Sequence, residues 1–320
     1  MSPMGEFDLI ARFFRRPARR SPLGSGDDCA LLAPRAGMQL AVSTDMLVEG
    51  RHFLSTVDPR RLGHKSLAVN LSDLAACGAQ PLAFTLSLAL PAIDEAWLAA
   101  FSRGLFALAD PYECELVGGD TTRGPLAISI TVFGEVPQGQ ALLRSGARAG
   151  DDLWASGSFG DARAALEVFR GALSLPAEAF EAARARMETP TPRIELGIAL
   201  RGIATSAVDV SDGLAGDLLH VLAASGVGAT IDSGAALTLL DCAEHIKPDS
   251  RLEYVLSGGD DYELLFTAPS PAREAVERAG AQSGTRVTRI GRIDVERGLR
   301  VIDAQGHAVD VSLASFDHFA

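Results

Sequence analysis

Apolar residues recur at helical spacing in several stretches of the chain, and each such stretch predicts a helix. The first is GEFDLIARFF, and the longest begins at Asp58-Pro59, a cap followed by a first-turn proline, and runs to about residue 77. Asp94 is expected to cap the helix DEAWLAAFSRGLFALA. Further helices are expected around residues 162–170, 177–187 and 193–201, in LAGDLLHVLAAS, and after YELLFTA.

Short apolar and β-branched runs alternate with these helices and predict strands. The predicted strands are CALL, QLAVST, AFTLSLAL, ELVGG, AISITVFGEV, DLWASG, SAVDV, GATI and YELLFTA. In LVGGDTTRG the strand is expected to end at two glycines and Asp120, and LSGGDDYELLF has the same form, so one explanation should cover both. The alternation predicts an α/β fold with mixed sheets.

The chain is expected to form two domains, because 320 residues exceed the size at which one hydrophobic core usually stops growing. A Pro-, Gly- and Arg-rich segment at residues 136–152 is the candidate linker, which gives domains at residues 1–137 and 138–320. VNLSDLAACGA in the first half echoes VDVSDGLAGDL in the second. We interpret this echo as two related folding units.

Composition narrows the possible partners. A net charge of -12 disfavours binding to nucleic acid or to an anionic membrane surface. The four cysteines lie far apart in sequence, which argues against a zinc site or a disulfide framework. The N-terminal stretch lacks a signal-peptide core, and no apolar run is long enough to span a bilayer, so a cytoplasmic protein is expected.

Aspartates recur along the chain, and most of them stand where an apolar run ends or a helix begins, at positions that line a ligand crevice in open α/β sheets. They are Asp27, Asp28, Asp45, Asp73, Asp120, Asp209, Asp212, Asp260 and Asp261. Carboxylates that share a crevice repel one another, and Mg²⁺, which prefers oxygen ligands and phosphates, would relieve that repulsion. The alternatives are a tight turn at each Gly-Gly-Asp and a helix-capping role for Asp73 and Asp212.

The usual phosphate-binding motifs are missing. The sequence contains no GxxxxGK[ST], no GxGxxG opening a helix, and no HRD or DFG set. Phosphates would therefore be held by Mg²⁺, by backbone amides of glycine turns and by arginines such as Arg123 or Arg144.

Several motifs occur in an order that spans nearly the whole chain: GDDCALL, STDMLVEGRHF, AVNLSDLAACGAQP, VGGDTTRGP, LLRSGARAGDD, DVSDGLAGDL, SGGDDYEL and FDHF. Together they resemble the thiamine-monophosphate kinase family of the aminoimidazole ribonucleotide synthetase-like superfamily. The resemblance implies a two-domain α/β subunit, a homodimer formed through the N-terminal domain, and transfer of the ATP γ-phosphoryl group to thiamine phosphate, which yields thiamine diphosphate.

The resemblance also implies residue roles. The Mg²⁺ ligands would be Asp28, Ser43, Thr44, Asp45, Asp73, Asp120, Asp209 and Asp212. The ATP contacts would be Gly119, Asp120, Arg144 and Ser211, and the thiamine phosphate contacts His52, Asp260 and Phe316. Asp260 stands where the family is expected to carry the longer glutamate, and Phe316 can stack but has no hydroxyl to donate.

The expected chemistry needs no catalytic base, because the nucleophile would be a phosphate oxygen that is already ionised near neutral pH. Two alternatives remain. The chain could be another ATP-using enzyme of the same superfamily, which product analysis would distinguish. It could also be a non-catalytic nucleotide or thiamine-phosphate binding protein, which would bind ligand without turnover.

Overall fold

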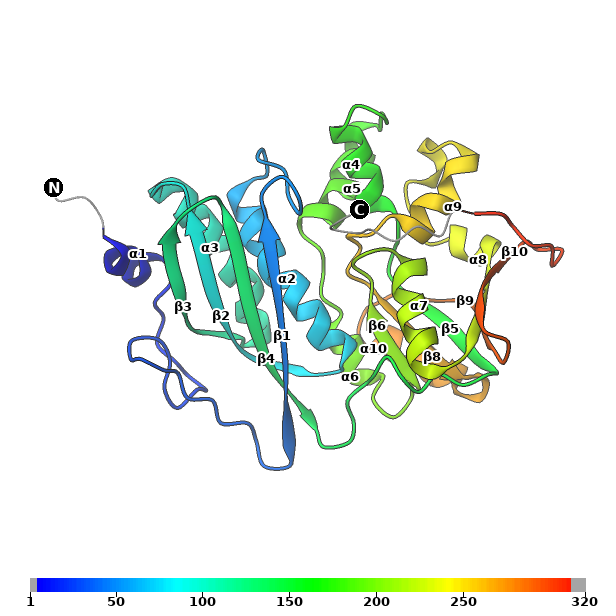
Figure 1. Cartoon of the computed structure of the whole chain (residues 1–320), viewed down its shortest axis with the longest axis horizontal. Helices are drawn as coiled ribbons and strands as arrows, with labels where there is room; N and C mark the ends of the chain where they lie inside the picture. The colour runs from blue at the N-terminus through cyan, green and yellow to red at the C-terminus, as the bar shows by residue number, and fades with distance from the viewer. Residues whose placement is uncertain (1–4, 312–320) are drawn as a thin grey trace. The chain divides into compact units, whose positions relative to one another are not determined.

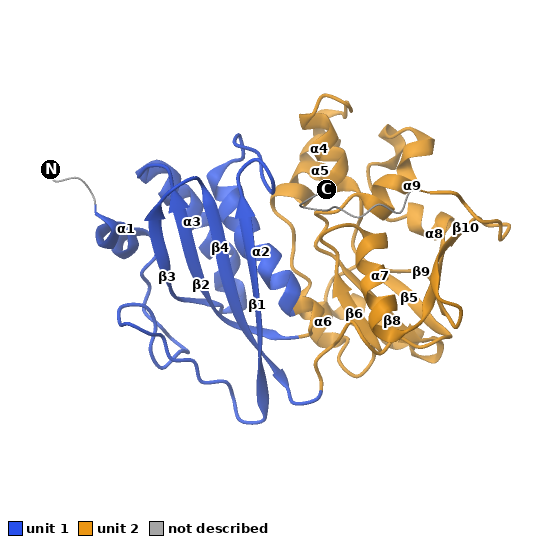
Figure 2. Ribbon diagram, viewed as in Figure 1, with its two compact units in different colours: residues 1–74, 79–139 blue, residues 75–78, 140–320 orange. Residues whose placement is uncertain are grey.

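The computed structural model describes residues 5–311, and the chain divides into two compact units (Figure 2). Unit 1 comprises residues 1–74 and 79–139, and unit 2 comprises residues 75–78 and 140–320. Each unit contains one sheet with helices packed against it, which agrees with the two α/β units expected from the sequence. The bounds 1–137 and 138–320, as limits of separate domains, stay a prediction. No helix within residues 5–311 is long and apolar enough to cross a membrane.

Unit 1 is built on a four-stranded sheet in the order β1-β4-β2-β3 (Figure 1). Its strands are β1 (Met38–Val48), β2 (Gln80–Leu90), β3 (Glu115–Arg123) and β4 (Ala127–Pro137). Only β2 and β3 pair in parallel, and the other neighbours are antiparallel. The helices are α1 (Glu6–Phe13), α2 (Pro59–Ala76) and α3 (Glu95–Ala109), followed by a 3₁₀ turn, η1 (Asp110–Tyr112). Asp94 caps α3 as expected, because its carboxylate accepts hydrogen bonds from the amides of Ala96 and Trp97.

Two glycines allow α2 and α3 to approach closely. A Cβ on Gly63 of α2 would lie 2.0 Å from the Phe101 carbonyl oxygen, and a Cβ on Gly104 of α3 would lie 1.8 Å from that of Arg60. Both helices carry buried leucines, among them Leu67 and Leu71 of α2. The glycine pair therefore fixes the position of α2, which carries two side chains that reach β1.

Unit 2 contains a six-stranded sheet in the order β10-β7-β9-β5-β8-β6. Its strands are β5 (Asp151–Ser156), β6 (Ser206–Asp209), β7 (Gly228–Asp232), β8 (Leu264–Pro269), β9 (Val287–Asp294) and β10 (Gly298–Ile302). Its α-helices are α4 (Asp161–Phe169), α5 (Ala177–Glu188), α6 (Ile194–Ala199), α7 (Leu214–Ser225), α8 (Ser233–Leu237), α9 (Pro248–Ser257) and α10 (Arg273–Gln282). Two 3₁₀ turns, η2 (Ala243–His245) and η3 (Ser270–Ala272), complete it. Side chains of β5, β6, β7, α7 and α9 form its main core.

The end of α2 belongs to unit 2. The guanidinium Nε of Arg201 donates to the Gly78 carbonyl at 2.6 Å, and the amide of Leu142 donates to the Cys77 carbonyl at 3.1 Å. Gly197 lies against the Ala75 carbonyl, where a Cβ would stand only 2.0 Å away. A four-residue segment from the first half of the sequence is thus part of the second unit.

The predicted strand CALL is wrong. Within residues 29–32 the only strand-type contact is an isolated bridge between Leu31 and Leu23. The apolar side chains of Ala30 and Leu32 pack instead on Leu82, Ala83 and Val117 of the unit 1 sheet. This segment is apolar because it covers the sheet, and it does not join the sheet.

The two Gly-Gly-Asp sequences have different structures, so the single explanation is wrong. Asp120 lies inside β3, which continues to Arg123, whereas the second Gly-Gly-Asp follows helix α9. The internal echo fails similarly, because Asp73 lies deep inside α2 while Asp212 lies in the loop between β6 and α7. The two echoed segments do not occupy equivalent positions.

Candidate active site

Ser43 and Asp73 form the best-defined contact among the candidate Mg²⁺ ligands. The Ser43 hydroxyl, on β1, donates to Oδ2 of Asp73, on α2, at 2.6 Å. One turn earlier on α2, Oδ1 of Asn70 accepts a hydrogen bond from the backbone amide of Asp45 at 3.0 Å. Because side chains alternate along a strand, Ser43 and Asp45 share the face of β1 that contacts α2. The structure therefore brings Ser43, Asp45 and Asp73 together.

Thr44 projects from the opposite face of β1. Its hydroxyl lies 3.0 Å from the Ile130 carbonyl, to which it donates, and 3.0 Å from the Thr131 hydroxyl on the neighbouring strand. The side chain of Thr44 is therefore not grouped with those of Ser43 and Asp45.

A cavity of about 740 Å³ lies between α1, residues 25–28 and β3. Its polar lining includes the exposed carboxylates Asp27, Asp28 and Asp120 together with Arg15, and its apolar lining comes mainly from α1 and β3. The cavity is lined by Phe7, Asp8, Ile10, Ala11, Phe14, Arg15, Ser25, Gly26, Asp27, Asp28, Ala30, Leu86, Leu116, Val117, Gly118, Gly119, Asp120 and Thr121. The structure thus brings Asp28, Gly119 and Asp120 to one concave surface.

The two groups of unit 1 carboxylates lie apart. Asp45 is on β1 and Asp120 is on β3, and these strands are the two edges of the four-stranded sheet. Neighbouring strands are about 4.8 Å apart, so three intervals separate the two backbones by roughly 14 Å. Within residues 5–311 no three His, Cys, Asp or Glu side chains stand close enough to hold a metal ion. Both aspartates also lie inside strands, which corrects the expectation that they stand at strand ends.

In unit 2, Asp209 is buried at the end of β6, and Ser211 and Asp212 follow in the loop that leads to α7. The buried carboxylate of Asp217, on α7, accepts hydrogen bonds from the amides of Ser211 and Asp212, each at 3.1 Å. Burial raises the pKa of Asp217 to about 6, against the lowering effect of these two hydrogen bonds. Asp217 therefore holds the loop that carries Ser211 and Asp212.

Neither Asp73 nor Asp212 is a helix cap. Asp73 lies in the last third of α2, and the N-cap of α7 is Gly213, which has no side chain to donate or accept. The capping alternative is thus excluded for both aspartates.

The loop at residues 258–262 lies beside this same segment. The amide of Asp260 donates to the Ser211 carbonyl at 2.7 Å, and the amide of Tyr262 donates to the Val210 carbonyl at 2.8 Å. The structure therefore brings Asp260, Ser211 and Asp212 together within unit 2.

Three other candidate residues, His52, Arg144 and Phe316, belong to none of the groups described above. Nδ1 of His52 accepts a hydrogen bond from the Val48 amide at 3.0 Å, so in that bond the proton of the neutral ring is on Nε2. Arg144 is exposed, and its carbonyl accepts a hydrogen bond from the Ser225 hydroxyl at 3.2 Å. Phe316 lies outside the described residues.

Comparison with known proteins covers nearly the whole chain. Residues 26–136 match the family described as AIR synthase related protein, N-terminal domain, and residues 148–304 match the corresponding C-terminal domain. The chain is 47% identical over 322 residues to thiamine-monophosphate kinase of Salmonella typhimurium, covering 99% of this chain and 98% of that protein.

The chain belongs to the thiamine-monophosphate kinase family.

Solved structures agree with this membership. The crystal structure of thiamine-monophosphate kinase from Stenotrophomonas maltophilia K279a has 46% sequence identity to this chain and a TM-score of 0.84. The match covers 94% of this chain and 95% of that one. AaThiL complexed with AMPPCP and TMP is 32% identical with a TM-score of 0.76, covering 90% and 89% of the two chains. The resemblance inferred from the sequence and the two-domain α/β fold are therefore confirmed.

Sequence reasoning missed two buried carboxyl groups beside the candidate residues of this kinase. In the sequence, Asp217 is one residue of the predicted helix LAGDLLHVLAAS, and Asp261 has no role assigned by the resemblance. Burial raises the pKa of Asp261 well above its ordinary value, against the Gly160 amide that donates to it. A signal was available for Asp217, because this carboxylate interrupts the otherwise apolar run LAGDLLHVL. Asp261 stands among polar residues, so the sequence gives no such signal for it.

Proposed function

We propose that this protein transfers the γ-phosphoryl group of ATP to thiamine phosphate and releases thiamine diphosphate. The observation that carries this proposal is the end-to-end match to thiamine-monophosphate kinase of Salmonella typhimurium, at 47% identity over 99% of the chain. The complex of AaThiL with AMPPCP, an analogue of ATP, and TMP supports the assignment of both substrates.

Mg²⁺ is the metal that suits the candidate ligands, because their side chains supply only carboxylate and hydroxyl oxygens. The side-chain ligands would be Asp28, Ser43, Asp45, Asp73, Asp120, Asp209 and Asp212. The Thr44 side chain lies on the opposite face of β1 and is not proposed as a ligand. Bound Mg²⁺ would neutralise the charge of the two polyanionic substrates. Ser43 would orient the Asp73 carboxylate through its 2.6 Å hydrogen bond, and Asn70 would hold the backbone at Asp45.

The remaining candidate residues would bind the organic parts and phosphates of the substrates. Gly119, Asp120, Arg144 and Ser211 would contact ATP, and His52, Asp260 and Phe316 would contact thiamine phosphate. Gly119 supports this assignment, because its φ of +145° and the absence of a side chain expose backbone at the cavity wall. No general base is proposed, since the attacking phosphate oxygen is already ionised.

We further propose a homodimer formed through unit 1. Leu40, Val42 and Met46 project from the face of β1 opposite α2, and they are 46%, 58% and 58% exposed. A row of exposed apolar side chains on one face of a sheet is typical of an interface with another protein chain. The same face carries Thr44, whose hydroxyl is already bonded to β4.

The purified chain, incubated with thiamine phosphate, ATP and Mg²⁺, should form thiamine diphosphate, measured by chromatography of the products. Omitting Mg²⁺ or adding a chelator should abolish the product. Tight binding of thiamine phosphate without turnover at any Mg²⁺ concentration would contradict the proposal and support a non-catalytic binding protein.

Asp45→Asn should lower kcat by about a hundredfold or more while leaving the melting temperature nearly unchanged, because it removes a ligand charge without removing core packing. The kinase assay and thermal unfolding measure the two effects. A parallel loss of activity and of stability would contradict a ligand role for Asp45.

A further inference from the structure

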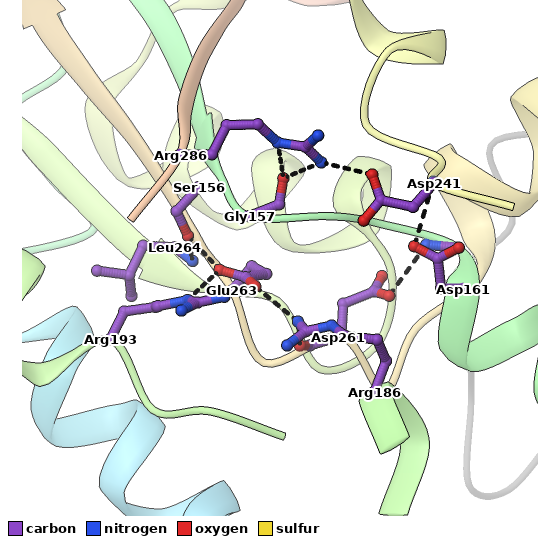
Figure 3. A network of polar contacts seen from close by, with 11 residues as sticks. Ser156, Gly157, Asp161, Arg186, Arg193, Asp241, Asp261, Glu263, Leu264 and Arg286 are labelled. Carbon is purple, nitrogen blue, oxygen red and sulfur yellow. Dashed lines mark hydrogen bonds and ion pairs between the residues drawn. The ribbon is translucent and has the colours of Figure 1, made fainter. Parts of the chain in front are cut away.

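Glu263 is a fully buried carboxylate between two arginines. Nη2 of Arg186 donates to its Oε1 at 2.6 Å, and Arg193 donates to both carboxylate oxygens through Nε and Nη2 (Figure 3). The Ser156 hydroxyl donates to Oε2 and in turn accepts the amide of Leu264 at 2.8 Å. We refer to Glu263, Arg186, Arg193 and Ser156 as the Glu263 cluster. Glu263 itself is 0% exposed, so it cannot contact a substrate.

The position of this cluster requires a glycine at residue 157. A Cβ on Gly157 would lie 1.9 Å from Oε1 of Glu263, and Gly157 has a φ of +55°. Arg186 comes from α5 and Arg193 from the segment that precedes α6. Elements distant in sequence thus converge on one carboxylate, and an isolated buried charge would be costly without them.

The loop next to Glu263 is held in an unfavourable conformation. Gly259, Asp260 and Tyr262 all have positive φ, at +70°, +63° and +50°, and two of these residues are not glycine. Such backbone persists only where the surrounding structure enforces it. The loop at residues 258–262 therefore depends on its neighbours for its shape.

The Glu263 cluster supplies that constraint directly. Besides binding Glu263, Nη2 of Arg186 donates to the Asp261 carbonyl at 3.1 Å, inside the loop. The Glu263 carbonyl accepts the amide of Val210 at 2.9 Å, and the loop amides of Asp260 and Tyr262 bind the carbonyls of residues 210–211. One buried carboxylate is thereby connected to both the loop and the end of β6.

We propose that the Glu263 cluster is a positioning device that sets the loop at residues 258–262, and with it Asp260, for binding thiamine phosphate. This inference rests on the proposed function, because only there does Asp260 contact thiamine phosphate. Glu263 is a positioning residue that acts through the loop backbone. Weakening the cluster releases the positive-φ residues, so Asp260 loses its fixed place. Of the proposed ATP contacts, Gly119 and Asp120 belong to unit 1, and Ser211 binds the loop through its backbone carbonyl, so ATP binding is less affected.

Glu263→Gln is the test, because it removes the charge and one acceptor without changing the size of the side chain. Asp152→Asn is the matched control: Asp152 is also a buried carboxylate of unit 2 held by two arginines, Arg273 at 2.6 Å and Arg289 at 3.3 Å. Both variants remove the charge of a buried, doubly paired carboxylate, and only Glu263 contacts the loop. Hydrogen exchange of the peptide around residues 258–264 and the KM for each substrate are measured for both.

The expected result for Glu263→Gln is exchange of the loop amides at least about tenfold faster and a KM for thiamine phosphate raised about tenfold, with a smaller change in the KM for ATP. Asp152→Asn should leave the loop exchange and both KM values near those of the wild type. Equal effects of the two variants, or unchanged loop exchange in a folded Glu263→Gln protein, would overturn the inference.

Arg186→Lys keeps the test decisive if Glu263→Gln does not fold. It retains a charge beside Glu263, and a single ammonium group cannot reproduce the planar guanidinium contacts to both Glu263 and the Asp261 carbonyl. Faster loop exchange is again expected, and unchanged exchange would overturn the inference. The exchange measurement needs no catalysis, so a wild-type protein without kinase activity would refute the proposed function while the exchange data still decide whether the cluster holds the loop.

Discussion

Gly119 allows β3 to continue past the point where the sequence suggested that it ends. Its φ is +145°, and a Cβ there would lie 1.9 Å from the Leu86 carbonyl oxygen on β2. No L-residue with a side chain fits without moving one of the two strands. Asp120 consequently lies within a strand and at the wall of the cavity beside α1.

Gly119→Ala should lower the free energy of unfolding by at least about 2 kcal/mol, from backbone strain together with overlap, and should reduce kinase activity at the same time. Gly139→Ala is the control, because Gly139 also has positive φ, +75°, and no atom lies within 4 Å of the added Cβ. Gly139→Ala should lower the free energy of unfolding by only about 1 kcal/mol. Urea unfolding measures both, and equal costs would show that the contact with Leu86 is unimportant.

Asp261 is expected to make the free energy of unfolding depend on pH. Its side chain is buried, and burial together with the charges of Asp161 and Asp260 raises its pKa, against the effect of Arg186. An acid whose pKa is raised on folding binds its proton more tightly in the folded state, so its contribution to stability is present at low pH and is lost as pH rises through the folded pKa.

Asp261→Asn replaces the carboxyl group by a group of the same shape that does not titrate. The free energy of unfolding of the wild type, relative to this variant, should therefore decline as pH rises from 5 to 9. Urea unfolding at a series of pH values measures the difference. A difference that stays constant over this range would show that Asp261 does not titrate with a raised pKa.

The contacts of single residues could be predicted only in part from the sequence. The family motifs predicted that Ser43 and Asp73 act together, and the structure places their side chains in hydrogen-bonding contact. The positions of Glu263 and Arg193 could not be predicted, because 70 residues separate them in sequence and local patterns carry no information on such contacts. The backbone conformation of Asp260 could not be predicted either, since positive φ is uncommon for aspartate.

At the scale of secondary-structure elements, the crossing of α2 and α3 determines where the candidate ligands stand. Gly63→Ala should separate the helices, because the added Cβ would lie 2.0 Å from the Phe101 carbonyl oxygen. We expect a loss of about 2–3 kcal/mol in the free energy of unfolding and a marked loss of kcat, since α2 carries Asn70 and Asp73.

Asp94→Ala provides the control for this change. It removes the N-cap of α3, at a cost of about 1 kcal/mol, and leaves the crossing of the two helices unchanged. Thermal unfolding and the kinase assay should show reduced stability with normal kcat. Unaltered kcat in Gly63→Ala as well would mean that the position of α2 does not matter to the active site.

Elements with strong local signals were predicted well. Helices α1, α2, α3 and α7 follow from apolar periodicity and clear caps or breaks. Helix α9 was missed, because it is short and its last residues lead into two glycines, as a strand followed by a turn would. The prediction of a strand at CALL was wrong, because an apolar segment that covers a sheet has the same local composition as a strand of that sheet.

At the scale of the whole molecule, the exposed apolar row on β1 predicts the oligomeric state. Val42→Glu should convert the proposed homodimer to a monomer, because it places a charge in the centre of that row. Val295→Glu is the matched control, since Val295 is 83% exposed and lies in unit 2. Light scattering during gel filtration measures the mass. A wild-type monomer, or a Val42→Glu dimer, would contradict an interface on this face.

The segment at residues 75–78 has a consequence for experiments that divide the chain. A fragment that starts at residue 140 contains all the strands of the second sheet. It lacks the Gly78 carbonyl that binds Arg201 and the Ala75 backbone that lies against Gly197. A single cut between β4 and β5 therefore yields a second half that lacks four residues of its own unit. A soluble C-terminal fragment would require the last turn of α2 to be supplied, for instance as a separate peptide or through a permuted chain.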